Sequence, residues 1–146
     1  LQRNLAPWDE RAALAIHGAD LLEVTPTSLE LAGLPGQYDA VLLDVPCSNT
    51  GVLRRRPDAK WRLTPQALSE VCALQRRFLE AAARLVKPGG RLVYSTCSIE
   101  PEENAAQVHG FIEAEPAWSL EAQRESFPWT DEHDGGTACL LRHCGR

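Results

Sequence analysis

Two cysteines, Cys47 and Cys97, each stand just beyond a short apolar run. Both runs are rich in Val and Leu, which is typical of strands buried on both faces of a sheet. Ligands of open α/β sheets bind just beyond the carboxyl ends of such strands. We therefore expect the two thiols to meet in one crevice, although 50 positions separate them in the sequence. A thiol in such a place is a candidate nucleophile.

Asp44 and Pro46 lie between the first apolar run and Cys47. Pro46 lacks an N–H group and has a fixed φ angle, so the chain is expected to leave the sheet at this point. Asp44 at the strand end is well placed to hold a polar ligand group, such as an amine or a ring N–H. This run therefore brings an acid and a thiol close together.

Hydroxyl side chains surround Cys97, and a helix is predicted to begin at Pro101. The positive end of a helix lowers the pKa of a nearby thiol, although Glu102 and Glu103 would oppose that effect. A cysteine near a strand end is also often a small buried hydrophobic residue. The residue types alone leave both interpretations open.

The composition is that of one globular domain with a hydrophobic core. The chain has 146 residues, of which 44% are hydrophobic and 24% charged, and no apolar stretch approaches the roughly 18 residues that span a bilayer. Five cysteines without a regular framework argue against a secreted disulfide fold and favour a reduced, cytoplasmic setting. We expect no metal site. The other cysteines are expected in the core (Cys72 and Cys139) or without an assigned partner (Cys144).

One segment is basic, although the chain carries a net charge of −5. The overall charge argues against nucleic-acid binding by bulk charge. A local basic loop can still contact phosphates, and its Trp can stack on a base. The alternatives are a solvated loop and a Trp that packs the loop onto the body, and both stay open. The candidate RNA-binding residues are Arg54, Arg55, Arg56, Lys60, Trp61 and Arg62.

The apolar runs belong to an alternation of strands and helices, which predicts an α/β sheet. Thr64 and Pro65 form a helix start, with Thr at the N-cap and Pro at the first helical position. No Gly-rich turn of the kind that cradles a nucleotide follows a first strand. The predicted strands cover residues 14–20, 41–44, 91–95 and 138–141. The predicted helices cover residues 28–32, 65–87 and 100–115. Residues 48–63 are predicted to form a long functional loop.

Two blocks of the sequence, residues 38–62 and 85–111, carry a family resemblance. The first contains Asp44-Val45-Pro46-Cys47-Ser48, Gly51 and Arg56-Pro57-Asp58; the second contains Lys87-Pro88-Gly89-Gly90, Ser95-Thr96-Cys97-Ser98 and Pro101-Glu102-Glu103-Asn104. In these blocks the chain resembles the RNA cytosine-5 methyltransferases of the Sun/Fmu and NOL1/NOP2 family. It departs from them at Asn49, where the family usually has Gly. Asn tolerates a left-handed turn, so we expect a mild effect.

The resemblance implies an α/β fold, the C-terminal portion of a Rossmann-like S-adenosylmethionine-dependent methyltransferase sheet. The first strands and the Gly-rich loop would be missing, so residues 1–146 would be a single truncated catalytic domain. The chain begins with Leu1 and contains no Met, which fits a piece of a longer protein. A sheet that lacks its first strands exposes unpaired strand groups, and we expect self-association of the fragment. No membrane partner is expected.

The resemblance also implies roles for individual residues. Cys97 would be the nucleophile, and Cys47 would assist product release. Asp44 would contact both the cofactor and the target base. Asp20 and Pro46 would complete the contacts to S-adenosylmethionine.

The implied reaction explains these residue types. Carbon 5 of cytosine is a poor nucleophile until the Cys97 thiolate attacks carbon 6, and an acid near ring N3 stabilises that adduct. The RNA substrate would be rRNA or tRNA, with the target base turned out of its stack. The alternatives are a non-catalytic RNA-binding or ribosome-assembly factor, and a thiol hydrolase or redox protein. The last needs a base beside Cys97, and no His lies near Cys97 in the sequence.

Overall fold

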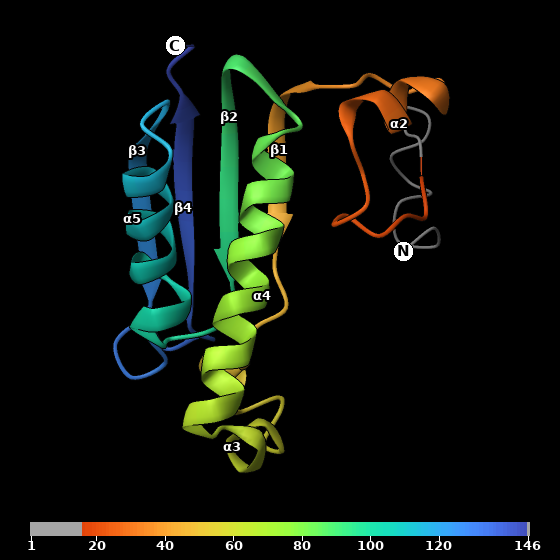
Figure 1. Cartoon of the computed structure of the whole chain (residues 1–146). Coiled ribbons are helices and arrows are strands. Elements are labelled where there is room, and N and C mark those ends of the chain that lie inside the picture. The colour runs from red at the N-terminus through yellow and green to blue at the C-terminus, as the bar shows by residue number, and fades with distance from the viewer. Residues whose placement is uncertain (1–15, 146) are drawn as a thin grey trace, which may run out of the picture.

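The computed structural model describes residues 16–145, and these form one four-stranded sheet with helices packed on it (Figure 1). The strand order is β1-β2-β4-β3. Strand β1 (Tyr38–Asp44) is parallel to β2 (Val86–Thr96). Strand β4 (Gly136–His143) is antiparallel to both β2 and β3 (Trp118–Ser126). The predicted α/β class is therefore confirmed.

Two helices, α4 (Pro65–Ala83) and α5 (Ala105–Ala114), cover one face of this sheet (Figure 1). Helix α4 begins where the sequence predicts, because the Thr64 side chain accepts a hydrogen bond from the Ala67 N–H at 3.1 Å. The shorter helix α2 (Pro26–Leu31) lies to the side of β1. No described helix is long and apolar enough to cross a membrane.

The core lies between the sheet and these two helices. Because side chains alternate along a strand, one residue in two on each strand faces the helices. The buried residues of this cluster include Leu43, Leu92, Tyr94, Cys139 and Leu141 from the sheet, and Leu79, Ala82, Val108 and Phe111 from the helices. The core position predicted for Cys139 is confirmed, whereas Cys72 is only half-buried.

The opposite face of the sheet carries a second apolar row. Leu42 pairs with Val93, and Val93 pairs with Leu140 on the next strand. None of the three is buried, and Leu42 is 72% exposed. Within the described residues no helix covers this face (Figure 1). A sheet of this class normally has both faces covered.

Several predicted element boundaries are wrong. Residues 16–20 are irregular rather than a strand, and the rest of the predicted strand 14–20 lies outside the described residues. Helix α4 ends at Ala83 instead of residue 87, because Val86 already pairs with Tyr38 in the sheet. Residues 87–90 then form an irregularity inside β2 before pairing resumes at Arg91.

The second half of the chain also differs from the prediction. The predicted helix 100–115 is broken at Asn104, whose φ and ψ of −112° and −102° separate a 3-10 turn (Pro101–Glu103) from α5. Strand β3 was not predicted, because it is mostly polar and lies at the edge of the sheet. The predicted loop 48–63 contains a 3-10 turn (Thr50–Val52) and a short helix, α3 (Ala59–Arg62).

Candidate active site

The two strand-end thiols lie in contact. The parallel pairing of β1 with β2 places Asp44 beside Ser95, so the chain segments that follow both strands leave the sheet at the same edge. Cys47 Sγ lies 2.9 Å from Cys97 Sγ, and both side chains are half-buried. The expectation that these two thiols meet is confirmed.

Asn49, in the segment that follows β1, forms hydrogen bonds with both cysteines. Its Nδ2 donates to the Cys47 carbonyl at 2.9 Å, and its Oδ1 accepts from the Cys97 thiol at 3.3 Å. The residue has φ 63° and ψ 23°, the left-handed conformation that Asn tolerates better than most residues. The expected tolerance is confirmed, and the amide adds a thiol contact that a Gly at this position lacks.

The surroundings of Cys47 change its acidity. Burial and the hydrogen bond with Cys97 raise the pKa of the Cys47 thiol to about 12. Cys47 therefore keeps its proton at neutral pH. A protonated Cys47 can donate a hydrogen bond to the sulfur of its neighbour, and it is itself a poor nucleophile.

The buried carboxylate of Glu103 is hydrogen-bonded to both segments that carry the thiols. It accepts hydrogen bonds from Ser48, which follows Cys47, and from Ser98, which follows Cys97. Sequence reasoning missed this role and took Glu103 only as an acid near the start of the predicted helix, where it would oppose a lower thiol pKa. The only signal was its place in the second family block, since residue type alone does not reveal burial.

The predicted cofactor residues, Asp20, Asp44 and Pro46, are all exposed. Asp44 and Pro46 lie at the carboxyl end of β1. Among the described residues, no hydrogen bond occupies the Asp44 carboxylate. The Asp20 carboxylate accepts the Leu22 N–H at 3.0 Å within its own turn. An open carboxylate at a strand end suits a ligand amine or hydroxyl.

All six residues of the candidate RNA-binding segment are exposed. Trp61 is 79% exposed, so it does not pack the loop onto the body. The Lys60 ammonium lies 4.6 Å from the centre of the Trp61 ring. Arg55 forms an ion pair with Asp134 at 2.8 Å, which leaves it partly neutralised.

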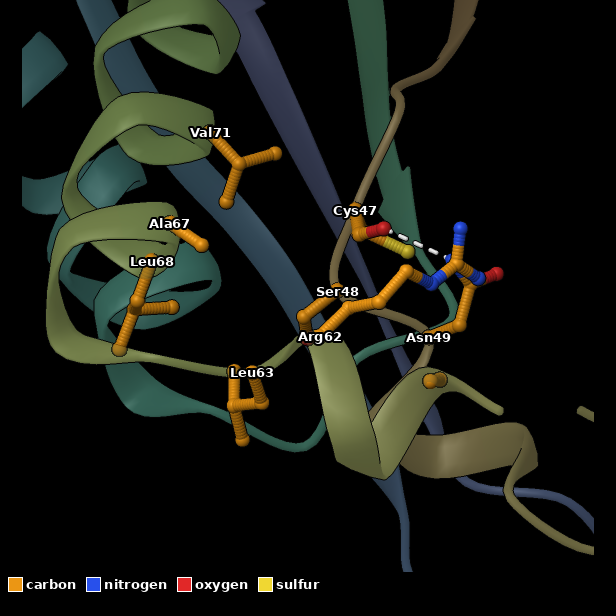
Figure 2. Close-up of a pocket in the computed structure, with 9 residues that line it drawn as sticks. Cys47, Ser48, Asn49, Arg62, Leu63, Ala67, Leu68 and Val71 are labelled. Atoms are coloured by element: carbon orange, nitrogen blue, oxygen red, sulfur yellow. Dashed lines mark hydrogen bonds between the residues drawn. The ribbon is translucent and has the colours of Figure 1, made fainter. Parts of the chain in front are cut away.

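A pocket of about 200 Å³ is lined by Cys47 and by Arg62, the last residue of the basic segment (Figure 2). In the view of Figure 2 the Arg62 side chain extends toward Asn49. Apolar side chains from the start of α4 form the opposite wall. The full lining is Cys47, Ser48, Asn49, Ala59, Arg62, Leu63, Ala67, Leu68 and Val71.

Comparison with solved structures defines the class of the fold. The structure of NSun6 from Pyrococcus horikoshii with SFG matches 99% of this chain and 38% of that chain, with a TM-score of 0.79 and 24% identity. A methyltransferase homologue from the same organism matches 97% of this chain and 48% of that chain, with a TM-score of 0.70. The chain thus shares the Rossmann-like α/β fold of these two structures. Residues 10–137 match the family of 16S rRNA methyltransferases RsmB/F, and the chain belongs to this family.

Curated relatives share high identity with part of the chain. The ribosomal RNA small subunit methyltransferase B of Salmonella arizonae is 42% identical over 106 residues, which are 68% of this chain and 25% of that protein. A probable enzyme of the same name from Synechocystis is 48% identical over 92 residues, or 63% of this chain and 20% of that protein. The chain spans about a quarter of the length of these relatives. The family predicted from the two sequence blocks is confirmed.

Proposed function

We propose that the chain is the C-terminal part of the catalytic domain of an S-adenosylmethionine-dependent RNA cytosine-5 methyltransferase. The observation that carries the proposal is the pair of strand-end thiols 2.9 Å apart, in a chain that belongs to the RsmB/F family. Relatives named as ribosomal RNA methyltransferases favour rRNA as the substrate over tRNA.

In this proposal Cys97 is the nucleophile. Its thiolate adds to carbon 6 of the cytosine, and the electrons of the carbon 5–carbon 6 double bond move so that carbon 5 becomes nucleophilic. Asp44, which is exposed at the end of β1, would hold the ring N3 side of the base. Carbon 5 takes the methyl group and then loses its proton to a base, and expulsion of the Cys97 thiolate restores the double bond.

The raised pKa of Cys47 supports this division of roles. A thiol that keeps its proton at neutral pH does not compete for carbon 6, and it can donate to the departing Cys97 sulfur at 2.9 Å. Cys47 is thereby suited to assist product release.

The methyl group comes from S-adenosylmethionine, which supplies an electrophilic sulfonium methyl when bound. Asp44 and Pro46 would hold the cofactor at the carboxyl end of β1, and Asp20 would reach its adenine side. The exposed basic segment would bind the RNA backbone, and Trp61 would stack on a base.

Two observations support a longer catalytic domain. The sheet face with Leu42, Val93 and Leu140 is uncovered within the described residues, and β1 is an edge strand. The curated relatives are about four times as long as the matched region. We propose that the preceding part of the protein pairs with β1 and covers this face.

RNA containing 5-fluorocytosine tests the role of Cys97 in the full-length protein. Fluorine at carbon 5 cannot be removed as a proton is, so a methylating enzyme remains attached to the base. We expect a covalent adduct that Cys97→Ala abolishes and that Cys144→Ala, a change at an exposed distant thiol, leaves intact. An adduct that survives Cys97→Ala would overturn the assignment.

The same assay tests Cys47 with unmodified RNA. We expect Cys47→Ala to accumulate the protein–RNA adduct, because expulsion of Cys97 becomes slow. Turnover of Cys47→Ala at the wild-type rate would contradict the release role. RNA binding without any methylation would instead favour an assembly factor.

A further inference from the structure

We infer that Glu103 is a positioning residue whose carboxylate fixes the two thiol-bearing segments relative to each other. An effect of Glu103 on methylation rests on the proposed function. Its effect on the positions of the two segments does not. Glu103 contacts neither sulfur, so it acts through the residues that follow the cysteines.

One carboxylate joins both segments. Its Oε2 accepts the backbone N–H of Ser48 at 2.9 Å, and its Oε1 accepts the hydroxyl of Ser98 at 2.6 Å. Ser48 and Ser98 directly follow the two cysteines. A shift of Glu103 is therefore transmitted to both thiols at once.

A third donor ties the carboxylate to helix α4. The side-chain amide of Gln75 donates to Oε2 of Glu103 at 2.8 Å and to the Pro46 carbonyl at 2.9 Å. The backbone before Cys47 and the backbone after it are thus held by the same pair of side chains. Gln75 and Glu103 are both 0% exposed.

The serine hydroxyls reinforce the link. Ser98 Oγ lies 3.1 Å from Ser48 Oγ and 3.2 Å from Thr50 Oγ1. Thr50 Oγ1 accepts the Ile99 N–H at 3.2 Å. The segments after β1 and β2 are therefore cross-connected by a buried polar network centred on one carboxylate.

Because Glu103 is buried, a change of its side chain is expected to disturb the hydrogen bonds of both segments. A buried carboxylate is costly unless donors surround it, and hydrogen bonds to a charged acceptor are short and directional. An apolar side chain in its place would leave the Ser48 N–H without an acceptor and the Gln75 amide with the Pro46 carbonyl alone. The segments would then be free to move, and a displacement of about 1 Å at a reacting group can cost about a hundredfold in rate.

The kinetic test compares two isosteric changes in the full-length protein. Glu103→Gln replaces one acceptor oxygen by a donor, whereas Glu102→Gln makes the same change at an exposed neighbour. For Glu103→Gln we expect kcat to fall about 10- to 100-fold with the RNA KM within about twofold of wild type. Glu102→Gln should retain the wild-type kcat. An unchanged kcat in folded Glu103→Gln, or a change in KM alone, would overturn the inference.

A second readout does not depend on methylation. Diamide removes one hydrogen atom from each of two adjacent thiols and links the sulfurs, becoming a hydrazine. Peptide mass spectrometry follows the Cys47–Cys97 link. We expect Glu103→Gln to slow its formation at least about fivefold relative to Glu102→Gln, since the rate depends on how the thiols are held. Equal rates in the two variants would refute the positioning role even where the adduct test succeeds.

Ser98→Ala provides a milder variant if Glu103→Gln does not fold. It removes one of the three hydrogen bonds to the carboxylate and leaves the charge in place. We expect the same two effects, a lower kcat at unchanged RNA KM and slower linking by diamide, each about threefold. Wild-type values for both measurements would overturn the inference.

Discussion

At the scale of single residues, the site depends on two touching thiols, one of which, Cys47, has a raised pKa. Burial and the hydrogen bond with Cys97 raise the pKa of Cys47 to about 12. The sequence shows both residue types. It does not show the raised pKa, because burial depends on residues far away in the chain.

Alkylation by iodoacetamide should separate Cys47 from an exposed thiol. A raised pKa means that the proton is kept to higher pH, so at pH 8 the thiolate fraction of Cys47 is only about one in ten thousand. We expect alkylation of Cys47 to be far slower than that of exposed Cys144 at pH 8 and to accelerate up to about pH 12. Peptide mass spectrometry measures both rates. Equal rates at pH 8 would contradict the raised pKa.

Gly51 is the residue at which any side chain should disturb the site most directly. Its N–H donates to the Cys97 carbonyl at 3.0 Å, and its carbonyl accepts the Gly135 N–H at 2.8 Å. A Cβ at Gly51 would lie 2.3 Å from the Gly135 carbonyl oxygen, which is backbone and cannot turn away.

We expect Gly51→Ala to lower the free energy of unfolding by about 2 kcal/mol through overpacking. Urea denaturation of the full-length protein measures the change. Gly18→Ala is the matched control, because nothing lies within 4 Å of a Cβ at Gly18. A loss no larger than that of the control would show that the backbone there can adjust.

At the scale of elements, the start of helix α4 was easier to predict than its end. Thr64 and Pro65 specify the start of α4 locally, through a side-chain cap and a fixed φ angle. The end of α4 depends on where Val86 meets Tyr38, which is a pairing between distant segments. Strand β3 was missed for the same reason, since its pairing with β4 rather than its own hydrophobicity makes it a strand.

Thr64→Ala should destabilise the protein by about 1 kcal/mol. The change leaves the Ala67 N–H without the acceptor that Thr64 Oγ1 provides at 3.1 Å. Thr64→Ser keeps that oxygen and should stay close to wild type in thermal or urea unfolding. Equal losses in the two variants would show that the cap does not stabilise α4.

At the scale of the whole molecule, one face of the sheet carries an apolar row that no helix within residues 16–145 covers (Figure 1). The Leu42–Val93–Leu140 row crosses three strands, and Leu42 is 72% exposed. Exposed strand edges and contiguous apolar surface favour association between copies.

We expect residues 1–146 produced alone to self-associate and Leu42→Glu to shift them toward the monomer. Sedimentation velocity over a range of concentrations measures the distribution. Leu31→Glu is the matched control, because Leu31 is 86% exposed on helix α2 and lies outside the sheet. An equal shift in the control would indicate a general effect of charge.

The sequence by itself determined the local features of this protein. The apolar runs define β1 and β2, the capping residues start α4, and two motif blocks identify the family. These features are encoded within a few neighbouring residues. The strand-end positions also predicted that Cys47 and Cys97 meet. Only the tertiary structure decided that Asn49 contacts both cysteines and that the Glu103 carboxylate joins the two segments. Burial, pKa and the buried network arise from contacts across about 50 positions of chain, and no local pattern specifies such contacts.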